Sequence, residues 1–274
     1  RLVLRAISRF SATIYLGVPS MYSLLLRIDP EMTGLFRSIR YCVSGGAALP
    51  VSVLKQFESR FGITVYEGDG PTECSPVTCV NPIGGETRPG TVGLPVPGVD
   101  MKIVDDEGNR VVMGHVGEIA VRGPNVMRGY WNQYEETEAV MRDGWFLTGD
   151  LGTEDTDGYF SIVDRKKDLV IVNGMNVYPR IIEEVLYRMD GITEAAVIGQ
   201  QHDLHGEIPV AYVVASDELD ETVIRHWCRE HLGRYQVPRK FYLVQALPKN
   251  AAGKILKREL SRRGEYERGV DSDR

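Results

Sequence analysis

The feature that most constrains the fold is a strand–helix–strand pattern between residues 38 and 67. Two short apolar runs, Ile39–Val43 and Ile63–Tyr66, mark the strands. Between them, Pro50 opens a segment whose apolar residues recur at helical spacing, and Gly62 closes it. Two strands connected through a helix form a βαβ unit, in which the strands run parallel. The sequence therefore predicts an α/β fold around a parallel sheet.

Both predicted strands are followed by glycine-rich stretches. Ser44-Gly45-Gly46-Ala47 comes after the first strand, and Gly68-Asp69-Gly70 comes after the second. The carboxyl ends of parallel strands form the edge at which open α/β sheets bind ligands. Because glycine and alanine have little or no side chain, the backbone there can approach a flat ligand closely. We therefore expect a ligand site where the two stretches meet.

Further along the chain the pattern changes twice. Residues 81–164 are rich in Gly and Pro and contain only short strand-like runs, which predicts a β-rich subdomain. Residues 165–168 are charged, and residues 169–274 mix helical and strand-like patterns in an α+β order. We expect a large domain over residues 1–164, with its βαβ portion in about 1–80, then a hinge at 165–168 and a small mobile domain over 169–274.

Composition narrows the range of functions. The chain has 274 residues, of which 43% are apolar and 26% charged, as in ordinary globular proteins. The net charge of -6 argues against nucleic-acid binding, which normally needs a basic face. No apolar run reaches the ~20 residues that span a bilayer, so no transmembrane segment is predicted. The four cysteines form no C-x-x-C pair, which fits a reducing compartment, and we expect a cytoplasmic protein.

Further short motifs follow the two glycine-rich stretches. Each of them alone is common by chance, whereas the whole series is rare. They are, in order, Pro71-Thr72-Glu73, Gly117-Glu118-Ile119, Arg122-Gly123, Thr148-Gly149-Asp150, Val163-Asp164-Arg165-Lys166-Lys167-Asp168 and Gly253-Lys254-Ile255-Leu256. In this order and at these spacings they resemble the adenylate-forming (AMP-binding) superfamily, which includes acyl-CoA synthetases, luciferases and peptide-synthetase adenylation domains. The stretches "GDGPTECSPVT" and "VDRKKDLVIVNGMNVYP" are most similar to fatty acyl-CoA synthetases, and the resemblance runs roughly from Val18 to Leu260.

The resemblance implies a nucleotide site in the large domain. Gly45-Gly46-Ala47 would lie against one face of the adenine, and the second stretch would cover the other face. The residues of that second stretch are Glu67, Gly68, Asp69, Gly70, Pro71 and Thr72. The Thr72 hydroxyl would reach the α-phosphate of ATP, and Glu73 offers the hard oxygen ligand that suits Mg²⁺.

The other implied site residues serve the ribose and the two half-reactions. Asp150 would accept both ribose hydroxyls, with Arg165 as its partner. Lys254 would contact the acyl carboxylate and the α-phosphate and offset the charge that builds during adenylation. Gly174 would line the pantetheine tunnel, since a residue without Cβ leaves room for the thiol arm. Lys167 would be the point about which the small domain rotates between the two steps.

By resemblance, the parent enzyme is an acid:CoA ligase that uses ATP, Mg²⁺ and CoA to activate a carboxylic acid, with a fatty acid favoured. The carboxylate attacks the α-phosphate to give acyl-AMP and pyrophosphate, and the CoA thiol then displaces AMP. The expected partners are these small molecules, and a homodimer is one assembly compatible with the sequence. Two alternatives stay open: an adenylation domain that loads a carrier protein, and a non-catalytic remnant that binds nucleotide or a partner.

Three features depart from the family pattern. The family carries a Ser/Thr/Gly-rich phosphate loop ending in Pro-Lys-Gly before the equivalent of Val18, and this chain shows no such segment. We therefore expect the chain to be inactive alone. Asp69 stands where many relatives carry an aromatic ring, and Ile181 replaces a common glutamate.

Several residues that could suggest other chemistry are expected to be structural. His202 and His205 lack the further ligands that a zinc site needs. Nothing in the sequence supplies an activating base to Cys74 or Cys79. We expect the side chains of Met113, Met127 and Met141 to pack in the core. We expect Lys249, Lys257 and Arg258 to face solvent.

Overall fold

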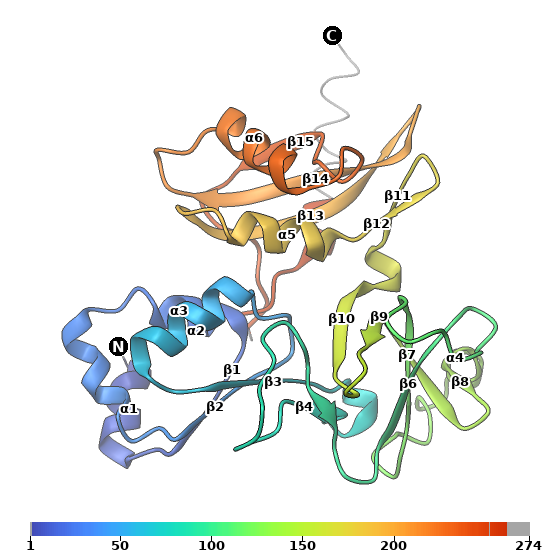
Figure 1. Cartoon of the computed structure of the whole chain (residues 1–274), viewed down its shortest axis with the longest axis horizontal. Helices are drawn as coiled ribbons and strands as arrows, with labels where there is room; N and C mark the ends of the chain where they lie inside the picture. Colours follow the sequence, from blue (N-terminus) through green and yellow to red (C-terminus); the bar gives the residue numbers. More distant parts are fainter. Residues whose placement is uncertain (1, 252, 262–274) are drawn as a thin grey trace. The chain divides into compact units, whose positions relative to one another are not determined.

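The computed structural model describes residues 2–251 and 253–261 and divides the chain into two compact units (Figure 1). The first unit ends at Val163 and the second begins at Asp164. Each unit has its own buried apolar clusters. None of the helices in the described residues is long and apolar enough to cross a membrane. The α/β and α+β character predicted from the sequence is confirmed.

The first unit begins with a parallel sheet. Its strands are β1 (Ile14–Gly17), β2 (Tyr41–Ser44) and β3 (Val65–Asp69), and both pairings, β1 with β2 and β2 with β3, are parallel. The accompanying helices are α1 (Leu2–Phe10), α2 (Pro19–Leu25), the 3₁₀ helix η1 (Pro30–Phe36) and α3 (Val51–Phe61). The predicted βαβ unit is therefore confirmed and consists of β2, α3 and β3.

An aromatic core holds α3 against this sheet. Leu54 and Phe57 lie buried on one face of α3, and Gly62 ends the helix in the left-handed conformation with φ 66°. The Phe57 ring lies edge-on to Tyr22 and Phe36, with ring centroids 4.9 Å and 5.9 Å away. Burial of each such side chain contributes about 1.5–3 kcal/mol. This packing fixes the positions at which the two strands of the βαβ unit end.

The sheet continues through two short antiparallel strands, β4 (Cys79–Val80) and β5 (Leu94–Pro95). β4 pairs with β3 through Gly68 and Asp69. The sequence placed these two residues after the strand, and that placement is wrong, because their backbone groups pair with β4. The turn that follows begins only at Gly70, and it leads into the 3₁₀ helix η2 (Thr72–Cys74).

The rest of the first unit is β-rich, as predicted. A sheet is formed by β10 (Phe160–Arg165), β9 (Trp145–Glu154), β7 (Gly117–Arg122) and β6 (Asp100–Val104), in this order, and β8 (Met141–Arg142) pairs with β9. Its core includes Val121, Phe146 and Phe160. The helix α4 (Tyr134–Val140) was not predicted, because it has no buried residue and hence no apolar stripe to recognise.

The second unit is a compact α+β structure. Its strands are β11 (Val170–Val172), β12 (Met175–Val177), β13 (Ile192–His202), β14 (Gly206–Ala215) and β15 (Lys240–Leu243), and its helices are α5 (Pro179–Tyr187) and α6 (Glu221–His231). The sheet order is β12-β11-β14-β13, and β15 pairs with β14. Ile182, Leu186 and Ile224 of the two helices share one buried cluster with the strands.

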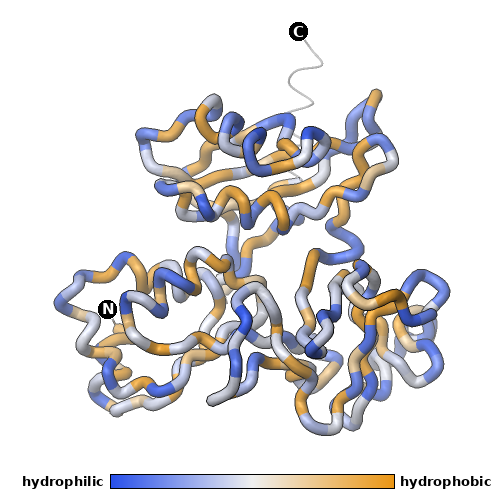
Figure 2. The backbone as a smooth tube through the Cα atoms, viewed as in Figure 1, coloured by the Kyte–Doolittle hydropathy of each residue, from blue (hydrophilic) through white to orange (hydrophobic). Residues whose placement is uncertain are grey.

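A short polar segment lies between β10 and β11. It forms the 3₁₀ helix η3 (Lys166–Asp168), and Figure 2 shows this connection as hydrophilic. Lys166 and Lys167 are exposed, and η3 contains no buried residue. The segment is thus not anchored by an apolar side chain of its own. Its action as a hinge stays a prediction.

Candidate functional site

The two glycine-rich stretches lie against each other at the carboxyl ends of β2 and β3. Ser44, the last residue of β2, is in register with Glu67 of β3. An ideal Cβ built on Gly45 would lie 3.5 Å from the carbonyl oxygen of Gly68. Gly46 has φ 76°, a backbone conformation that favours glycine. The structure therefore brings the two predicted stretches together at one edge of the parallel sheet.

The Glu67 side chain is buried and accepts a hydrogen bond from the backbone that follows the first glycine-rich stretch. It is 2% exposed, and its Oε1 accepts a hydrogen bond of 3.0 Å from the Leu49 N–H. Its backbone carbonyl accepts bonds from the N–H and the side-chain amide of Asn81, at 2.9 Å and 3.0 Å. Glu67 thus holds the loop of Gly46 and Ala47, both exposed, to the end of β3. A direct contact between Glu67 and a nucleotide stays a prediction.

The turn at Gly70 admits no side chain. A Cβ on Gly70 would lie 1.4 Å from the Pro76 carbonyl oxygen, and a Cβ on Gly68 would lie 2.9 Å from that of Cys79. The Thr78 N–H and hydroxyl both donate to the Asp69 carbonyl oxygen at 2.9 Å and close this loop. The second stretch is therefore a rigid turn, and it presents the exposed Thr72 at its rim.

Glu73, the predicted Mg²⁺ ligand, is half-buried and held in place by Tyr130. The Tyr130 hydroxyl donates to Glu73 Oε1 at 2.8 Å, and the Met127 N–H donates to the Glu73 carbonyl oxygen at 2.7 Å. Burial raises the pKa of Tyr130 to about 12, and the Glu73 carboxylate adds to this rise. Sequence reasoning missed Tyr130, since no motif or spacing connects two residues so far apart in the chain.

The described residues around Glu73 do not form a metal centre of their own. Within the described residues, no group of three or more His, Cys, Asp or Glu side chains could hold a metal ion. Mg²⁺ bound with substrate phosphates typically takes one or two protein carboxylates and completes its shell with phosphate oxygens and water. A single oriented carboxylate at Glu73 suits that mode and does not suit a permanent metal centre.

Asp150 lies on β9 and is 9% exposed. Its N–H donates to the Thr148 hydroxyl at 3.1 Å, and that hydroxyl donates to the Ile119 carbonyl oxygen of β7 at 2.9 Å. The Gly149 N–H donates to Glu118 Oε1 at 3.0 Å. The Thr-Gly-Asp segment is therefore fixed to β7 at Thr148 and at Gly149, which gives Asp150 a defined backbone position.

Three predicted site residues belong to the second unit. Arg165 is exposed and directly follows the buried Asp164. Gly174 has φ 79° in the exposed turn between β11 and β12, and nothing lies within 4 Å of a Cβ built on it. Lys254 lies in a turn at which Gly253 has φ 84°. Each is described within its own unit, and the assembly of one site from both units stays a prediction.

Some expectations about individual side chains are wrong. Met113 is 51% exposed, although Met127 and Met141 pack against a core cluster. Lys257 does not face solvent: its side chain is 26% exposed and pairs with Glu183 at 2.7 Å, because three nearby carboxylates attract it. Lys249 is likewise only 27% exposed and pairs with Glu194. Arg258 is exposed, as expected.

The cysteines and histidines take no evident part in chemistry. Burial raises the pKa values of the Cys74 and Cys79 thiols to about 12, with Asp69 and, for Cys74, Glu73 adding to the rise. Both thiols are therefore protonated and unreactive at neutral pH. His202 and His205 stack with ring centroids 4.8 Å apart at the β13–β14 turn.

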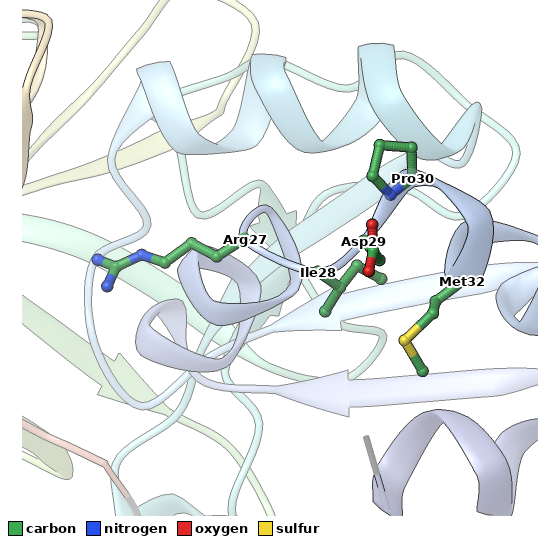
Figure 3. Close-up of a pocket in the computed structure, with 5 residues that line it drawn as sticks. All are labelled: Arg27, Ile28, Asp29, Pro30 and Met32. Atoms are coloured by element: carbon green, nitrogen blue, oxygen red, sulfur yellow. The ribbon is translucent and has the colours of Figure 1, made fainter.

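A surface cavity of about 470 Å³ lies elsewhere in the first unit. It is lined by Arg27, Ile28, Asp29, Pro30 and Met32, between α2 and η1 (Figure 3). In Figure 3 the Arg27 side chain extends away from the other four labelled residues. None of the predicted site residues lines this cavity, so it adds nothing to the candidate site.

Comparisons with known proteins agree with this picture. A family model described as "AMP-binding enzyme" matches residues 1–131, and one described as "AMP-binding enzyme C-terminal domain" matches residues 181–254. A long-chain-fatty-acid–CoA ligase of Bacillus subtilis (strain 168) is 43% identical over 261 residues, which cover 94% of this chain and 46% of the ligase. A feruloyl-CoA synthase of Amycolatopsis is 38% identical over 95% of this chain and 54% of that protein.

A solved structure of ATP-bound MatB from Rhodopseudomonas palustris aligns with a TM-score of 0.88 at 38% identity, covering 95% of this chain and 52% of that chain. The chain thus spans about half the length of the relatives that it matches.

Proposed function

Because the chain belongs to the AMP-binding enzyme family, we propose that it forms part of an acid:CoA ligase that converts a carboxylic acid to acyl-AMP and then to a CoA thioester. One observation carries the proposal. In a chain 43% identical to a long-chain-fatty-acid–CoA ligase, the two glycine-rich stretches meet at the carboxyl ends of adjacent parallel strands. That edge is where open α/β sheets bind nucleotides. A fatty acid is the proposed substrate class, since the B. subtilis relative carries that name.

The first unit would bind the ATP. The adenine would lie between the Gly45-Gly46-Ala47 backbone and the turn around Gly70. Asp150 would accept the ribose hydroxyls, and the Thr72 hydroxyl would donate to an α-phosphate oxygen. Mg²⁺, when bound, supplies charge neutralisation at the phosphates, and Glu73, oriented by Tyr130, would be its ligand.

The second unit would contribute to the two steps in turn. During adenylation, Lys254 would place its ammonium group near the attacking carboxylate and the α-phosphate, where negative charge builds. During thioester formation, Gly174 would leave room for the pantetheine arm. Both residues belong to one compact unit, yet they serve different steps. The unit would therefore rotate between the steps, with Lys167 as the point of rotation.

Two other functions differ from this proposal in their acceptor or in catalysis. An adenylation domain would transfer the acyl group to the thiol of a carrier protein in place of CoA. A non-catalytic remnant would bind nucleotide and support no pyrophosphate exchange. The B. subtilis relative is named a CoA ligase and the Amycolatopsis relative a CoA synthase, which favours CoA as the acceptor.

A chimera tests the reaction type. This chain replaces the matching 261-residue segment of the B. subtilis ligase, and thioester formation is measured with a fatty acid, ATP and either CoA or a carrier protein. We expect acyl-CoA and no acyl-carrier product. A folded chimera that exchanges pyrophosphate but acylates only the carrier protein would favour the adenylation domain. A folded chimera that binds ATP without exchange would favour the remnant. Separately, the 274-residue chain alone should form no acyl-CoA.

A further inference from the structure

Lys257 lies among carboxylates in the second unit. Its Nζ is 2.7 Å from Oε1 of Glu183 on α5, and the two side chains are 26% and 16% exposed. The same Glu183 oxygen accepts a hydrogen bond of 2.7 Å from the Val197 N–H on β13. Glu183 therefore ties Lys257 to a helix and to a strand of the same unit.

Asp164, the first residue of the second unit, belongs to the same cluster. It is 5% exposed, and its carboxylate accepts the N–H of Arg165 at 2.8 Å and that of Arg180 at 2.9 Å. Arg180 is in the first turn of α5, where the helix dipole favours a negative charge. Asp164 thus connects the start of the predicted hinge to α5.

The charges of the cluster depend on one another. Burial raises the pKa of Asp164, and the ammonium group of Lys257 opposes this rise. Burial lowers the pKa of Lys257, but Glu183, Asp164 and Asp168 outweigh that effect and raise it above its ordinary value. Lys257 is therefore positively charged at neutral pH, and its loss would leave the buried Asp164 carboxylate near the partly buried Glu183 carboxylate without the positive charge of the ammonium group.

Lys254 lies three residues before Lys257, in a turn closed by hydrogen bonds. The Asn250 N–H donates to the Lys254 carbonyl oxygen, and the Lys254 N–H donates to Asn250 Oδ1, both at 2.9 Å. The Leu256 N–H donates to the Pro248 carbonyl oxygen at 2.8 Å. Lys257 adds a side-chain link from this turn to Glu183 on α5.

We propose that Lys257 is a positioning residue for Lys254: the ion pair between Lys257 and Glu183 fixes the turn that carries Lys254 to helix α5 of the same unit. The inference rests on the proposed function, in which Lys254 acts in adenylation alone. Glu183 and Lys257 both follow the hinge in the chain, so a rotation about Lys167 leaves their ion pair intact. Lys254 then moves with the unit as one body.

Hydrogen exchange on the 274-residue chain tests the link without any activity. In Lys257→Met, the Lys254 and Leu256 amides should exchange about tenfold faster or more, because their turn opens locally. The Val213 amide, in the core strand β14, should exchange as before. The neighbouring exposed Arg258 provides the matched control, and Arg258→Met should change none of these rates. Unchanged Lys254 and Leu256 rates in Lys257→Met would overturn the proposal.

Rescue separates positioning from folding. Lys257→Arg keeps the charge and should restore most of the protection at Lys254 and Leu256. If Lys257→Met accelerates exchange at Val213 as well, the unit has lost its fold, and Lys257→Arg then becomes the deciding variant. Failure of Lys257→Arg to protect Lys254 in a folded unit would overturn the proposal.

Half-reaction assays in the chimera give the functional test. Lys257→Met should lower the kcat of acyl-AMP formation by about tenfold to a hundredfold, as expected for a misplaced catalytic group, with the KM for ATP little changed. Thioester formation from preformed acyl-AMP should stay within about twofold of the unmodified chimera. Equal losses in both steps would contradict a role through Lys254. An unmodified chimera without acyl-AMP formation would instead refute the proposed function, and hydrogen exchange would still decide the link.

Discussion

A methyl group at Gly70 tests how the second glycine-rich stretch is built. A Cβ on Gly70 would lie 1.4 Å from the Pro76 carbonyl oxygen and 2.8 Å from the Val77 Cα. Non-bonded heavy atoms prefer about 3.5 Å, so the backbone at Pro76 would have to move by roughly 2 Å. The two bonds of 2.9 Å from Thr78 to the Asp69 carbonyl oxygen close the loop and resist this movement.

We therefore expect Gly70→Ala to destabilise the first unit by about 3 kcal/mol, the upper end of the usual cost of overpacking. For a unit of this size, 1 kcal/mol shifts the melting temperature by about 2–4 °C, so the expected fall is about 6–12 °C. Differential scanning calorimetry measures it, with an unchanged transition of the second unit as internal reference. A melting temperature within about 1 °C of the unmodified chain would refute the reasoning.

Gly45→Ala is the matched control in the neighbouring stretch. A Cβ there meets only the Gly68 carbonyl oxygen at 3.5 Å, an ordinary contact. Its stability should therefore change by less than about 0.5 kcal/mol. If adenine lies on this stretch, the added methyl should cost about 1–3 kcal/mol of ATP binding, or roughly fivefold to 150-fold in Kd. Unchanged ATP binding by titration calorimetry would remove the adenine from this stretch.

Three further predictions concern other residues. Asp150→Ala should raise the Kd for ATP by about a hundredfold or more, since two charge-assisted bonds of about 1.5–3 kcal/mol each are lost; a Kd unchanged in equilibrium dialysis would exclude Asp150 from the site. Alkylation of Cys74 and Cys79 at pH 8 should be about a thousandfold slower than that of an ordinary thiol, because burial raises both pKa values to about 12. The rate of alkylation should increase with rising pH. Rapid labelling of both thiols in the folded chain would contradict this prediction. Lys167→Pro fixes φ at about -65° and should hold the hinge in one conformation. One half-reaction in the chimera should then be lost while the other persists. Retention of both half-reactions would refute the hinge assignment.

The sequence predicts the βαβ unit correctly because its signals are local. The apolar spacing from Leu54 to Phe57 and the closing Gly62 are signals within one helix. Because a single helix connects β2 to β3, parallel pairing of the two strands is the expected arrangement. The adjacency of Gly45 and Gly68 follows from that pairing. Here the local pattern and the tertiary structure agree.

Contacts between residues far apart in the sequence cannot be predicted from local patterns. Nothing near Lys257 in "GKILKREL" distinguishes it from the exposed Arg258, because its partners Glu183 and Asp164 lie far away in the chain. The hydrogen bond from Tyr130 to Glu73 is equally invisible, since a tyrosine in a polar loop carries no periodic signal. Charge and hydrogen-bond partners become predictable only when the tertiary arrangement of the strands is known.

The central claim is that Lys254 serves adenylation in a two-step acid:CoA ligase. The most direct test is rapid-quench measurement of both half-reactions in the chimera with Lys254→Ala. The account predicts that acyl-AMP formation falls by about 10²–10³, as for the loss of one electrostatic stabiliser, while preformed acyl-AMP is still converted to acyl-CoA at nearly the unmodified rate. Equal losses in both half-reactions, or full retention of both, would contradict it.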